Sequence, residues 1–458
     1  MRTTDAAALA EACAGRVIGF GTASCSRVET DSRKVSPGAL FIALKGERAD
    51  GHDYIGKAFE AGAYIVLSER ETEVPEGRAL ILVNNTRLAL GDIARWYRTT
   101  LDMKVVGITG SVGKTSTKEF VYAVLSEKYK CYKTKLNFNN DLGLPLTVLS
   151  IEPDCECAVL EMGMNHFGEI DYLTKIARPD IAVITNIGVA HIEHLGSREN
   201  ILKAKLEILS GLAEGGTVVI NGDEPLLWNA RGGALSGYKT YTYGVKNKDV
   251  DLFADGVRRL EDGMAFSTDG LLKTDVKILA PGAHNVQNAL CAMCVGHALG
   301  LSADEIKRGL LRYEQIEKRL NFIKSGGVVL IDDTYNANPD SMRAAIKVLE
   351  SSEGGRKIAV LGDMLELGSY SKEAHEILGA DLCEAGVDAV FLKGENTKYT
   401  LSRVSGKIKD AFFFESDEAL TESLKKYAKP DDVILIKGSH GMKMENILRL
   451  WKAGERDC

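Results

Sequence analysis

A glycine-rich turn near residue 110 has the residue types and spacing of a phosphate-binding loop. An apolar run over 105–109 leads into Gly110, Ser111, Val112, Gly113, Lys114, Thr115 and Ser116. The glycines let backbone N–H groups point at a phosphate, the lysine supplies a positive charge, and the threonine hydroxyl can ligate Mg²⁺. The turn therefore predicts a nucleotide, ATP or GTP, as the ligand.

The spacing of this turn differs from the usual P-loop pattern, G-x-x-x-x-G-K-[ST], which would need a glycine at Ile108. The sequence has the shorter pattern T-G-x-x-G-K-T at 109–115, which indicates a phosphate site only where a strand precedes it and a helix follows it. A strand is predicted over 105–109, and an amphipathic helix is predicted from Thr115 to about Leu125. The alternative is a purely structural turn between a strand and a helix. Because strand, turn, lysine, hydroxyl and helix coincide, we favour the phosphate site.

Two further side chains that could serve a nucleotide follow strands of the same region. Glu161 ends a strand predicted over 157–162 and is either an Mg²⁺ ligand or a solvated carboxylate. His191 follows a strand predicted over 181–185 and is either a ligand or a structural histidine. Ligands of open α/β sheets bind outside the carboxyl ends of the strands, which favours the ligand interpretation for His191.

Three polar segments have the composition of binding loops, and ordinary turn chemistry is the alternative for each. The first is the amide-rich loop 137–145. The second, 332–338, places carboxylates, a phenol and amides after a strand, and the third, 437–441, offers donors suited to a carboxylate. Lys205 lies on a helix predicted over 197–212 and is, by spacing alone, a solvated lysine.

Length and composition indicate an ordinary globular protein with several domains. At about 150 residues per domain, 458 residues correspond to roughly three domains. The net charge of −7 argues against a nucleic-acid binder, and no apolar stretch approaches the roughly 20 residues that span a bilayer. The N-terminus has no secretory signal and the nine cysteines have no disulfide-type spacing, so we expect a cytoplasmic protein with reduced thiols.

Turn signals and apolar runs divide the chain into three blocks. We predict a small N-terminal α/β domain over 1–88, a central domain over 89–316 and a Rossmann-like C-terminal α/β domain over 317–458. Alternating strands and helices in the central block predict a mostly parallel P-loop-type sheet with helices on both faces, and 238–280 predicts an antiparallel edge. The predicted strands are 39–44, 63–67, 80–83, 105–109, 157–162, 181–185, 217–220, 328–332, 357–361, 389–392 and 433–437.

Further motifs stand in order along the chain. They are T-D-S-R at 30–33, G-A-L-F-I-A-L-K-G at 38–46, N-F-N-N-D-L-G-L-P at 137–145, E-M-G-M at 161–164, Y-N-A-N-P at 335–339 and L-G-D-M-L-E-L-G at 361–368. Together with the glycine-rich turn, they resemble the Mur ligases, which build the peptide stem of the bacterial cell-wall precursor. The resemblance covers essentially the whole chain. It is strongest to the ligases that join D-alanyl-D-alanine to UDP-N-acetylmuramoyl-tripeptide.

The resemblance implies one domain for the UDP-linked substrate, a central ATPase and a C-terminal domain that brings the dipeptide and closes over ATP. It implies ATP contacts at Gly110, Ser111, Val112, Gly113, Lys114, Thr115, Ser116, Asn288, Arg319 and Asp333, and catalytic roles for Lys114, His191 and Lys205. Two Mg²⁺ ions are implied at Thr115, Glu161 and His191. UDP-substrate contacts are implied at Asp31, Ser32, Arg33, Lys45, Asn139 and Asn140, and dipeptide contacts at Asn338, Ser439 and His440.

Lys205 and His440 need separate consideration. Lys205 matches a lysine that several family members carry as a carbamate, which turns a cation into a metal-binding carboxylate analogue. His440 stands where this subgroup is expected to have an arginine, so the sequence leaves its role with the dipeptide carboxylate open.

The implied reaction couples ATP to amide-bond formation. The tripeptide carboxylate attacks the γ-phosphoryl group to give an acyl phosphate, and the dipeptide amine then displaces phosphate through a tetrahedral intermediate. The metals and Lys114 offset the charge that develops, and a closing domain excludes water. The expected partners are the two substrates, with no nucleic acid, and we expect a monomer.

Three alternatives are weaker. A sister ligase that adds a single amino acid to the dipeptide precursor normally carries Asp-Asn-Pro-Arg in its C-terminal domain, a motif absent from this sequence. A folate polyglutamate ligase shares the ATPase core but not the first block. A P-loop switch protein has no reason for polar strand ends in the third block.

Overall fold

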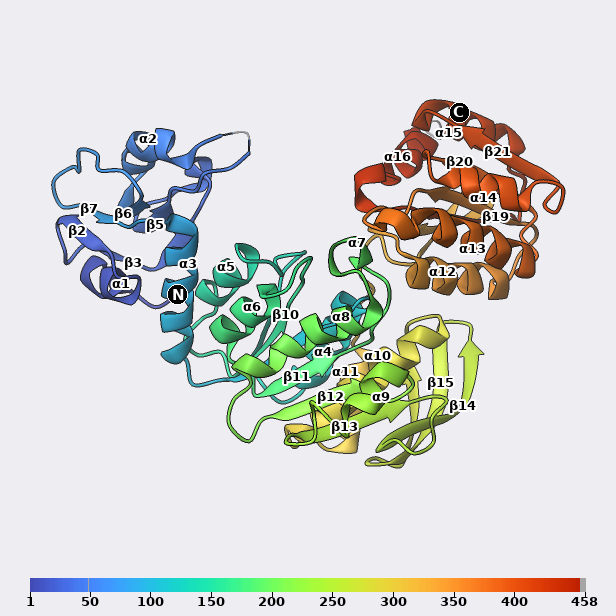
Figure 1. The fold of residues 1–458 in the computed structure, drawn as a ribbon, viewed down its shortest axis with the longest axis horizontal. Coiled ribbons are helices and arrows are strands. Elements are labelled where there is room, and N and C mark those ends of the chain that lie inside the picture. The colour runs from blue at the N-terminus through green and yellow to red at the C-terminus, as the bar shows by residue number, and fades with distance from the viewer. Residues whose placement is uncertain (48, 454–458) are drawn as a thin grey trace.

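The structure is a computed structural model that describes residues 1–47 and 49–453. Figure 1 shows three bodies in chain order, coloured blue, green to yellow, and orange to red. Their strands form a five-stranded, a nine-stranded and a six-stranded sheet, with a two-stranded ribbon in the first body. The predicted fold class of three α/β domains is confirmed. The exact boundaries at 88 and 316 stay a prediction.

The N-terminal domain is built on a mixed five-stranded sheet. Its elements are β1 (Thr4–Asp5), α1 (Ala6–Ala12), β2 (Arg16–Gly19), β3 (Ser24–Cys25), β4 (Arg27–Glu29), β5 (Ala39–Ile42), α2 (Ile55–Glu60), β6 (Ala63–Ser68) and β7 (Ala79–Leu82), with 3₁₀ turns at Ser32–Lys34 and Gly51–Tyr54. The strand order is β2-β7-β6-β5-β4. β5, β6 and β7 are apolar and almost entirely buried, as expected for strands covered on both faces.

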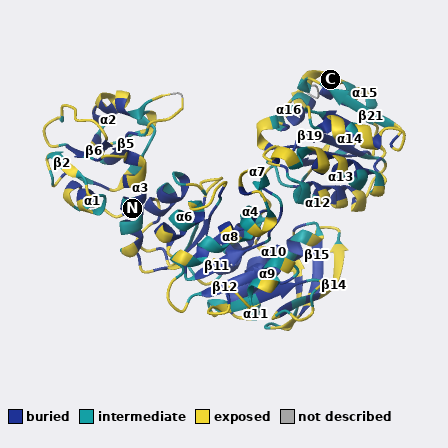
Figure 2. Cartoon of the chain, viewed as in Figure 1, coloured by how far each residue is buried: buried dark blue, intermediate teal, exposed yellow. Residues whose placement is uncertain are grey.

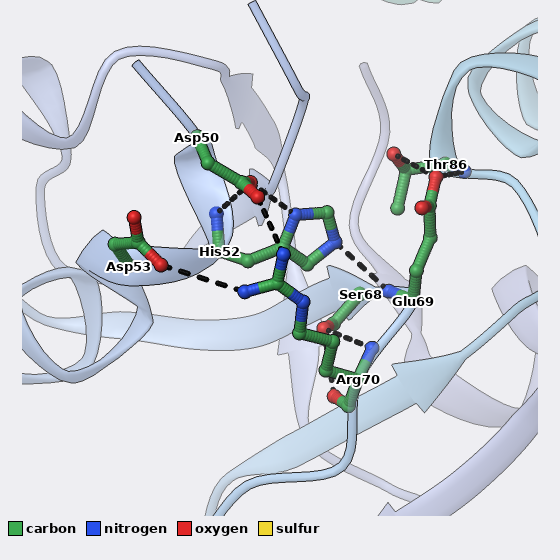
Figure 3. Close-up of polar contacts among 7 residues, drawn as sticks. All are labelled: Asp50, His52, Asp53, Ser68, Glu69, Arg70 and Thr86. Carbon is green, nitrogen blue, oxygen red and sulfur yellow. Dashed lines mark hydrogen bonds and ion pairs between the residues drawn. The ribbon is translucent and has the colours of Figure 1, made fainter.

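A polar network fixes one corner of this domain (Figure 3). Nδ1 of the buried His52 ring lies 2.6 Å from Oδ1 of Asp50, and Nε2 accepts a hydrogen bond from the N–H of Glu69. The carboxylate of Glu69 in turn accepts a hydrogen bond from the N–H of Thr86 at 2.9 Å, where helix α3 (Thr86–Thr99) begins. The network therefore ties the loop before His52 to the helix that leads into the central domain.

Helix α3 connects the first two domains and packs against both. The side chain of Asn85 caps its first turn by accepting from the N–H of Leu88. The hydroxyl of the fully buried Tyr97 donates to the carbonyl of Ile151 in the central domain at 2.8 Å. One hydrophobic cluster continues from the N-terminal sheet through α3 into the central domain. The first two domains therefore share one hydrophobic cluster, and each also has a cluster of its own.

The central domain carries the predicted alternation of strands and helices. Its elements are β8 (Lys104–Thr109), α4 (Lys114–Leu125), β9 (Cys131–Lys133), α5 (Gly143–Leu149), β10 (Cys157–Glu161), α6 (Glu169–Ala177), β11 (Ile181–Ile184), α7 (Ile192–Leu195), α8 (Arg198–Leu206), β12 (Thr217–Asn221), α9 (Pro225–Ala230), β13 (Lys239–Gly244), β14 (Leu252–Leu260), β15 (Gly263–Gly270), β16 (Thr274–Ile278), α10 (Ala283–Ala298) and α11 (Ala303–Leu311). The sheet order is β16-β15-β14-β13-β12-β11-β8-β10-β9. Figure 2 shows β11 and β12 buried beneath helices whose outer faces are exposed, whereas β14, near the edge of the sheet, is largely exposed.

Two details of the central domain refine the sequence prediction. The helix predicted over 197–212 ends as an α-helix at Leu206 and continues as a 3₁₀ turn over Glu207–Gly211. A Cβ at Gly211 would lie 2.3 Å from the carbonyl oxygen of Thr174, so this turn packs closely on α6. The antiparallel edge predicted over 238–280 is confirmed for β14, β15 and β16, whereas β13 pairs with β12 in parallel.

The C-terminal domain is a Rossmann-like sheet in the order β17-β18-β22-β19-β20-β21, parallel except for β17. Its elements are β17 (Asn321–Ser325), β18 (Val328–Asp333), α12 (Pro339–Ser351), β19 (Lys357–Gly362), α13 (Ser371–Glu384), β20 (Ala389–Lys393), α14 (Thr397–Val404), β21 (Asp410–Phe414), α15 (Asp417–Tyr427), β22 (Val433–Lys437) and α16 (Glu445–Ala453), with 3₁₀ turns at Gly368–Tyr370 and His440–Met442. The four predicted strands are present, and the edge strands β17 and β21 were not predicted. Two hydrophobic clusters of its own stabilise this domain.

Candidate active site

A cavity of about 430 Å³ lies between the central and C-terminal domains, at the carboxyl ends of β8, β10 and β11. Of the residues implied by the resemblance, those that line it are Ser111, Val112, Gly113, Lys114, Thr115, Ser116, Asn139, Asn140, Glu161, His191, Asn288, Arg319, Asp333 and Asn338. The chain thus brings together most of the predicted nucleotide and metal residues. They come from two separately folded sheets.

The predicted phosphate loop connects β8 to α4. Gly110 has a φ of 154°, and a Cβ there would lie 1.9 Å from Oγ1 of Thr185, so a side chain does not fit. Gly113, with a φ of 82°, precedes the first residue of α4, Lys114. The ammonium of Lys114 donates to the carbonyl of Gly110 at 2.7 Å. The loop therefore places backbone N–H groups and a helix N-terminus at the cavity, as a phosphate site requires.

Asn186 supports this loop from the neighbouring strand, and the sequence analysis did not single it out. Its Oδ1 accepts hydrogen bonds from the N–H groups of Ser111 and Val112 at 3.0 and 2.9 Å. The hydroxyl of Ser111 accepts from the N–H of Gly188 at 2.9 Å. The only signal in the sequence was the position of Asn186 just after a strand. An amide in a turn has no distinctive spacing, so that signal was weak.

Glu161 ends β10 with its side chain buried at the cavity wall. Its Oε1 accepts from Nδ2 of Asn139 at 2.8 Å, and its N–H donates to Oγ1 of Thr134 at 3.0 Å. Its Oε2 is buried and has no hydrogen-bond partner among the described residues. A buried carboxylate oxygen without a partner is unfavourable unless a cation or donor fills its place. The arrangement suits a carboxylate that receives a metal ion.

Lys205 is a buried amine and not the solvated lysine that its helical spacing suggested. It is 1% exposed. Burial, and secondarily repulsion from Lys114, lower the pKa of Lys205 well below its ordinary value. Burial also lowers the pKa of Lys114, against the attraction of Glu161. The positive charges of Lys114 and Lys205 repel each other, so protonation of both side chains at once is unfavourable.

His191 lies at the start of α7 and lines the cavity. Nδ1 of its ring is 2.9 Å from Oε2 of Glu366, which belongs to the C-terminal domain. The close approach of the His191 ring, and secondarily its charge, lower the pKa of the Glu366 carboxyl, in spite of partial burial. His191 is therefore held between two domains.

Arg319 reaches from the segment before β17 to the phosphate loop. Its Nη2 donates to Oγ1 of Thr115 at 3.1 Å, and its guanidinium carbon lies 4.2 Å from the ring centre of Tyr335. Stacking on an aromatic face holds the planar guanidinium while it bridges two domains. In this arrangement the Thr115 hydroxyl faces Arg319 rather than open space.

Asn288 and Asp333 line the cavity but already have partners. Oδ1 of Asn288 accepts from the hydroxyl of Thr117 at 3.0 Å, and its Nδ2 donates to Asn285. Oδ2 of Asp333 lies 2.6 Å from Nζ of Lys437. Both side chains are therefore fixed in position before any ligand arrives.

The three residues expected at the dipeptide occupy different places. Asn338 lines the cavity, and its Oδ1 caps α12 by accepting from the N–H of Ser341. Ser439 is buried, accepts from the N–H of Leu365 at 2.9 Å and donates to the carbonyl of Ala337. The exposed ring of His440 lies edge-on to Tyr335, outside the cavity wall. Asn338 is thus at the cavity, whereas Ser439 and His440 lie behind and beside it.

The residues expected at the UDP-linked substrate divide between two domains. Asn139 and Asn140 line the cavity, and Asn140 also accepts from the N–H of Gly143. The other four, Asp31, Ser32, Arg33 and Lys45, lie in the N-terminal domain and do not line this cavity. The exposed Arg33 forms a two-pronged ion pair with Asp31, which lowers the pKa of the Asp31 carboxyl to about 2.

Other cavity residues carry no sequence signal. Tyr243, Tyr313, His284 and Gln287 line it, from β13 and the neighbourhood of α10 and α11. His284 and Gln287 stand just before Asn288 in α10, whereas Tyr243 and Tyr313 lie elsewhere in the chain in segments that show no motif. Only the sheet order, which places β13 and α10 beside the phosphate loop, brings them there.

Among residues 1–47 and 49–453, no three His, Cys, Asp or Glu side chains gather into a metal-binding group. Within the same residues, no helix combines the length and the apolar character needed to cross a bilayer.

A phosphate loop that faces a second α/β domain across one cavity is the arrangement of an enzyme that uses a nucleoside triphosphate while it holds another substrate. The chain belongs to the Mur ligase family. The family model described as Mur ligase middle domain matches 108–296, the Mur ligase, glutamate ligase domain matches 318–440, and the Mur ligase family, catalytic domain matches 25–98.

Individual relatives agree with this assignment. The chain is 44% identical over 434 residues to the UDP-N-acetylmuramoyl-tripeptide–D-alanyl-D-alanine ligase of Bacillus subtilis, and 37% identical over 430 residues to that of Escherichia coli; each match covers 92% of both chains. It superposes on MurF from Acinetobacter baumannii with a TM-score of 0.91 at 34% identity over 99% of both chains. For MurF of Thermotoga maritima in complex with ADP, the TM-score is 0.84 at 32% identity over 94% of this chain and 98% of that one. The resemblance predicted from the motifs is confirmed for family and subgroup.

Proposed function

We propose that this chain is an ATP-dependent ligase that joins D-alanyl-D-alanine to UDP-N-acetylmuramoyl-tripeptide in the synthesis of the peptidoglycan precursor. The observation that carries this proposal is the 44% identity over 92% of both chains to a relative named for that reaction, because it includes all three domains. The cavity supports it, since polar side chains of the C-terminal domain face the phosphate loop.

The nucleotide is ATP, with its β- and γ-phosphates on the loop from Gly110 to Ser116. The N–H groups of the loop and the Lys114 ammonium would bind the phosphate oxygens. Asn288 would contact the adenine from α10, and Arg319 and Asp333 would reach the nucleotide from the C-terminal side. A relative 32% identical to this chain has been solved with ADP, which supports the choice of nucleotide.

Two Mg²⁺ ions belong to this proposal, and the residues present fit them. Thr115, Glu161 and His191 line the same cavity, and Oε2 of Glu161 is buried without a hydrogen-bond partner among the described residues. Phosphate oxygens of the nucleotide would complete the coordination, since magnesium usually binds through few protein ligands. When bound, the ions neutralise charge on the phosphates and on the attacking carboxylate.

A carbamate on Lys205 also fits the surroundings of this residue. Only a neutral amine adds to carbon dioxide, and burial beside Lys114 favours the neutral form of Lys205. A carbamate would exchange an unfavourable pair of lysine charges for an attractive one. In this proposal the catalytic residues are Lys114, His191 and Lys205, and a carbamate on Lys205 would supply a further carboxylate-like group.

The two organic substrates approach from opposite sides. The UDP-linked substrate would bind Asp31, Ser32, Arg33 and Lys45 of the N-terminal domain and extend its peptide past Asn139 and Asn140 into the cavity. The dipeptide would bind on the C-terminal side, at Asn338, Ser439 and His440. The reacting carboxylate and amine would meet beside the phosphate loop.

The residues of the chain support two successive steps. The tripeptide carboxylate attacks the γ-phosphorus of ATP and displaces ADP to give the acyl phosphate, while Lys114 stabilises the charge on the phosphate oxygens. The dipeptide amine then adds to the acyl phosphate carbonyl, loses a proton and expels inorganic phosphate. The C-terminal domain covers the cavity, which keeps water from hydrolysing the acyl phosphate.

We place the enzyme in the cytoplasm as a monomer. The eight cysteines in the described part of the chain are free thiols, as in a reducing compartment. Both walls of the cavity come from one chain, so the proposed site needs no second copy.

Release of inorganic phosphate should require ATP, the UDP-linked tripeptide and D-alanyl-D-alanine together, and mass spectrometry should find the pentapeptide product. Tripeptides ending in diaminopimelate and in lysine are to be compared as substrates. Phosphate release that is unchanged without the dipeptide would favour a nucleotide-driven switch. Incorporation of a single amino acid onto the dipeptide precursor would favour the sister ligase.

A further inference from the structure

The contact between Glu366 and His191 joins two domains at the edge of the cavity. Oε2 of Glu366 is 2.9 Å from Nδ1 of His191, and the His191 side chain is 21% exposed. The Nδ1 atom has no straight hydrogen bond here, so the ring must turn to donate its proton to the carboxylate. Glu366 belongs to the motif L-G-D-M-L-E-L-G at 361–368 but is not among the site residues that the resemblance implies.

The loop that carries Glu366 is held firmly within the C-terminal domain. The N–H of Leu365 donates to the hydroxyl of Ser439 at 2.9 Å, and the N–H of Met364 donates to Nε2 of the buried His375 at 3.1 Å. Oδ1 of Asp363 accepts from the N–H of Thr397 at 2.9 Å. These bonds hold the three residues before Glu366 and so fix the backbone from which its side chain projects.

Both contact residues have left-handed backbone conformations. The φ angle is 61° at Glu366 and 64° at His191, and neither residue is a glycine. Such a conformation is unfavourable for a residue with a side chain and persists where the surrounding structure enforces it. Two such residues meet here across a domain boundary, so the backbone on both sides of the contact is held in an uncommon conformation.

The domains are in close contact on either side of this pair. A Cβ at Gly368 would lie 3.0 Å from Cγ of Glu193, and a Cβ at Gly188 would lie 2.2 Å from Oδ2 of Asp340. Any movement of the C-terminal domain away from α7 would therefore withdraw Glu366 from His191.

The chemistry of the imidazole explains what the carboxylate does. A histidine can bind a metal only through a ring nitrogen that carries no proton, and a hydrogen bond at the other nitrogen sets which one that is. A carboxylate that holds the proton on Nδ1 leaves Nε2 free for a cation and fixes the plane of the ring.

We propose that Glu366 is a positioning residue of the ligase, which orients His191 toward the bound metal ion when the C-terminal domain is seated on the central domain. This inference rests on the proposed function, because the metal site at His191 belongs to it. Metal affinity would then depend on the position of the C-terminal domain, although the proposed metal ligands Thr115, Glu161 and His191 all lie in the central domain.

Binding of Mn²⁺ in the presence of ADP, measured by electron paramagnetic resonance, tests the proposal without turnover. Loss of an outer carboxylate partner costs about 10- to 100-fold in metal affinity, so Glu366→Ala should weaken Mn²⁺ binding by about 10-fold or more. Glu366→Asp should restore part of the affinity. Glu373→Gln, a change at an exposed glutamate of α13, is the matched control and should bind Mn²⁺ as the wild type does.

A double-mutant cycle with His191→Ala separates positioning from general damage. If Glu366 acts through His191, Glu366→Ala should cost little further Mn²⁺ affinity once His191 is absent. In turnover, Glu366→Ala should lower kcat and raise the Mg²⁺ concentration needed for half activity, with the KM for the UDP-linked tripeptide unchanged.

Wild-type Mn²⁺ affinity in Glu366→Ala, or an equal loss in the presence and absence of His191, would overturn the inference. Melting temperatures of each variant show whether the fold is retained. Dipeptide-dependent phosphate release by the wild type is measured separately. Its absence would remove the proposed ligase function and leave the metal-binding result intact.

Discussion

Nζ of Lys437 lies 2.6 Å from Oδ2 of Asp333, and both side chains are buried where β22 and β18 run side by side in register. Lys437 also donates to the carbonyl of Asn336 at 2.8 Å. One buried ion pair therefore holds together the two strand ends that face the phosphate loop across the cavity.

Replacement of Lys437 by methionine should destabilise the C-terminal domain. The change leaves the Asp333 carboxylate buried without its partner, which typically costs about 3–5 kcal/mol. Chemical denaturation gives the free energy of unfolding, and Lys452→Met, at an exposed lysine of α16, is the control. Adding Asp333→Asn should recover part of the loss. Wild-type stability of Lys437→Met would mean that the pair contributes nothing to the fold.

Lys114→Ala should abolish turnover while the UDP-linked substrate still binds. The lysine is expected to neutralise charge on the transferred phosphoryl group, and removing such a group costs at least about 10²-fold in kcat. The UDP site lies in a different domain, so calorimetric affinity for UDP-linked tripeptide should not change. Lys128→Ala, at an exposed lysine just beyond α4, is the control. Equal loss of UDP-substrate binding would contradict the domain assignment.

Gly110→Ala should disrupt the phosphate loop. The added Cβ would overlap Oγ1 of Thr185 and sit at a φ of 154°, so the loop has to move, at a cost of about 1–3 kcal/mol. We expect a lower melting temperature and loss of ADP binding by calorimetry. At Gly56 in α2 a Cβ meets open space, and Gly56→Ala should stabilise the protein by about 0.5–1 kcal/mol. Normal ADP binding by Gly110→Ala would argue against phosphate binding by this loop.

Acid should destabilise the protein partly through His284. Burial, and secondarily the Lys437 charge, lower the pKa of His284 from 6.5 to about 4. Between these values the unfolded chain takes up a proton that the folded protein does not, so stability falls as the pH falls through this window. The ring lines the cavity and keeps some solvent contact, which reduces the effect.

Melting temperatures from pH 7 to pH 4 check this dependence. The melting temperature should fall less steeply with acid in His284→Gln than in the wild type. His440→Gln, at an exposed histidine, should follow the wild type. Parallel curves for wild type and His284→Gln would show that His284 does not titrate in this way.

The sequence predicted the elements whose signals are local. Apolar runs located the buried strands, and the glycine, lysine and threonine pattern located the start of α4 within one residue. β17 and β21 were missed because edge strands are only half buried, as the intermediate exposure throughout β21 illustrates. The sequence placed Lys114, Glu161 and His191 near one another because they stand at or after the carboxyl ends of β8, β10 and β11, and all three line the cavity. Their roles stay a prediction.

What the sequence did not predict depends on contacts between distant segments. Spacing alone indicated a solvated Lys205, because the neighbours that bury it come from elsewhere in the sheet. Asn186 has no motif, although it bonds two N–H groups of the phosphate loop. The pairing of Glu366 with His191 depends on how two domains meet, which no local pattern encodes.

The hydrophobic core of the chain is divided unequally. One cluster runs through the N-terminal and central domains, each of which also has a cluster of its own. The buried residues of the other two clusters all belong to the C-terminal domain. On heating, the N-terminal and central domains should therefore unfold together and the C-terminal domain separately, in two cooperative transitions rather than three. The active site lies between these two units. A compound that fills the cavity between the central and C-terminal domains would contact both of them. It would couple the two unfolding transitions and hold the two domains in one fixed relative orientation.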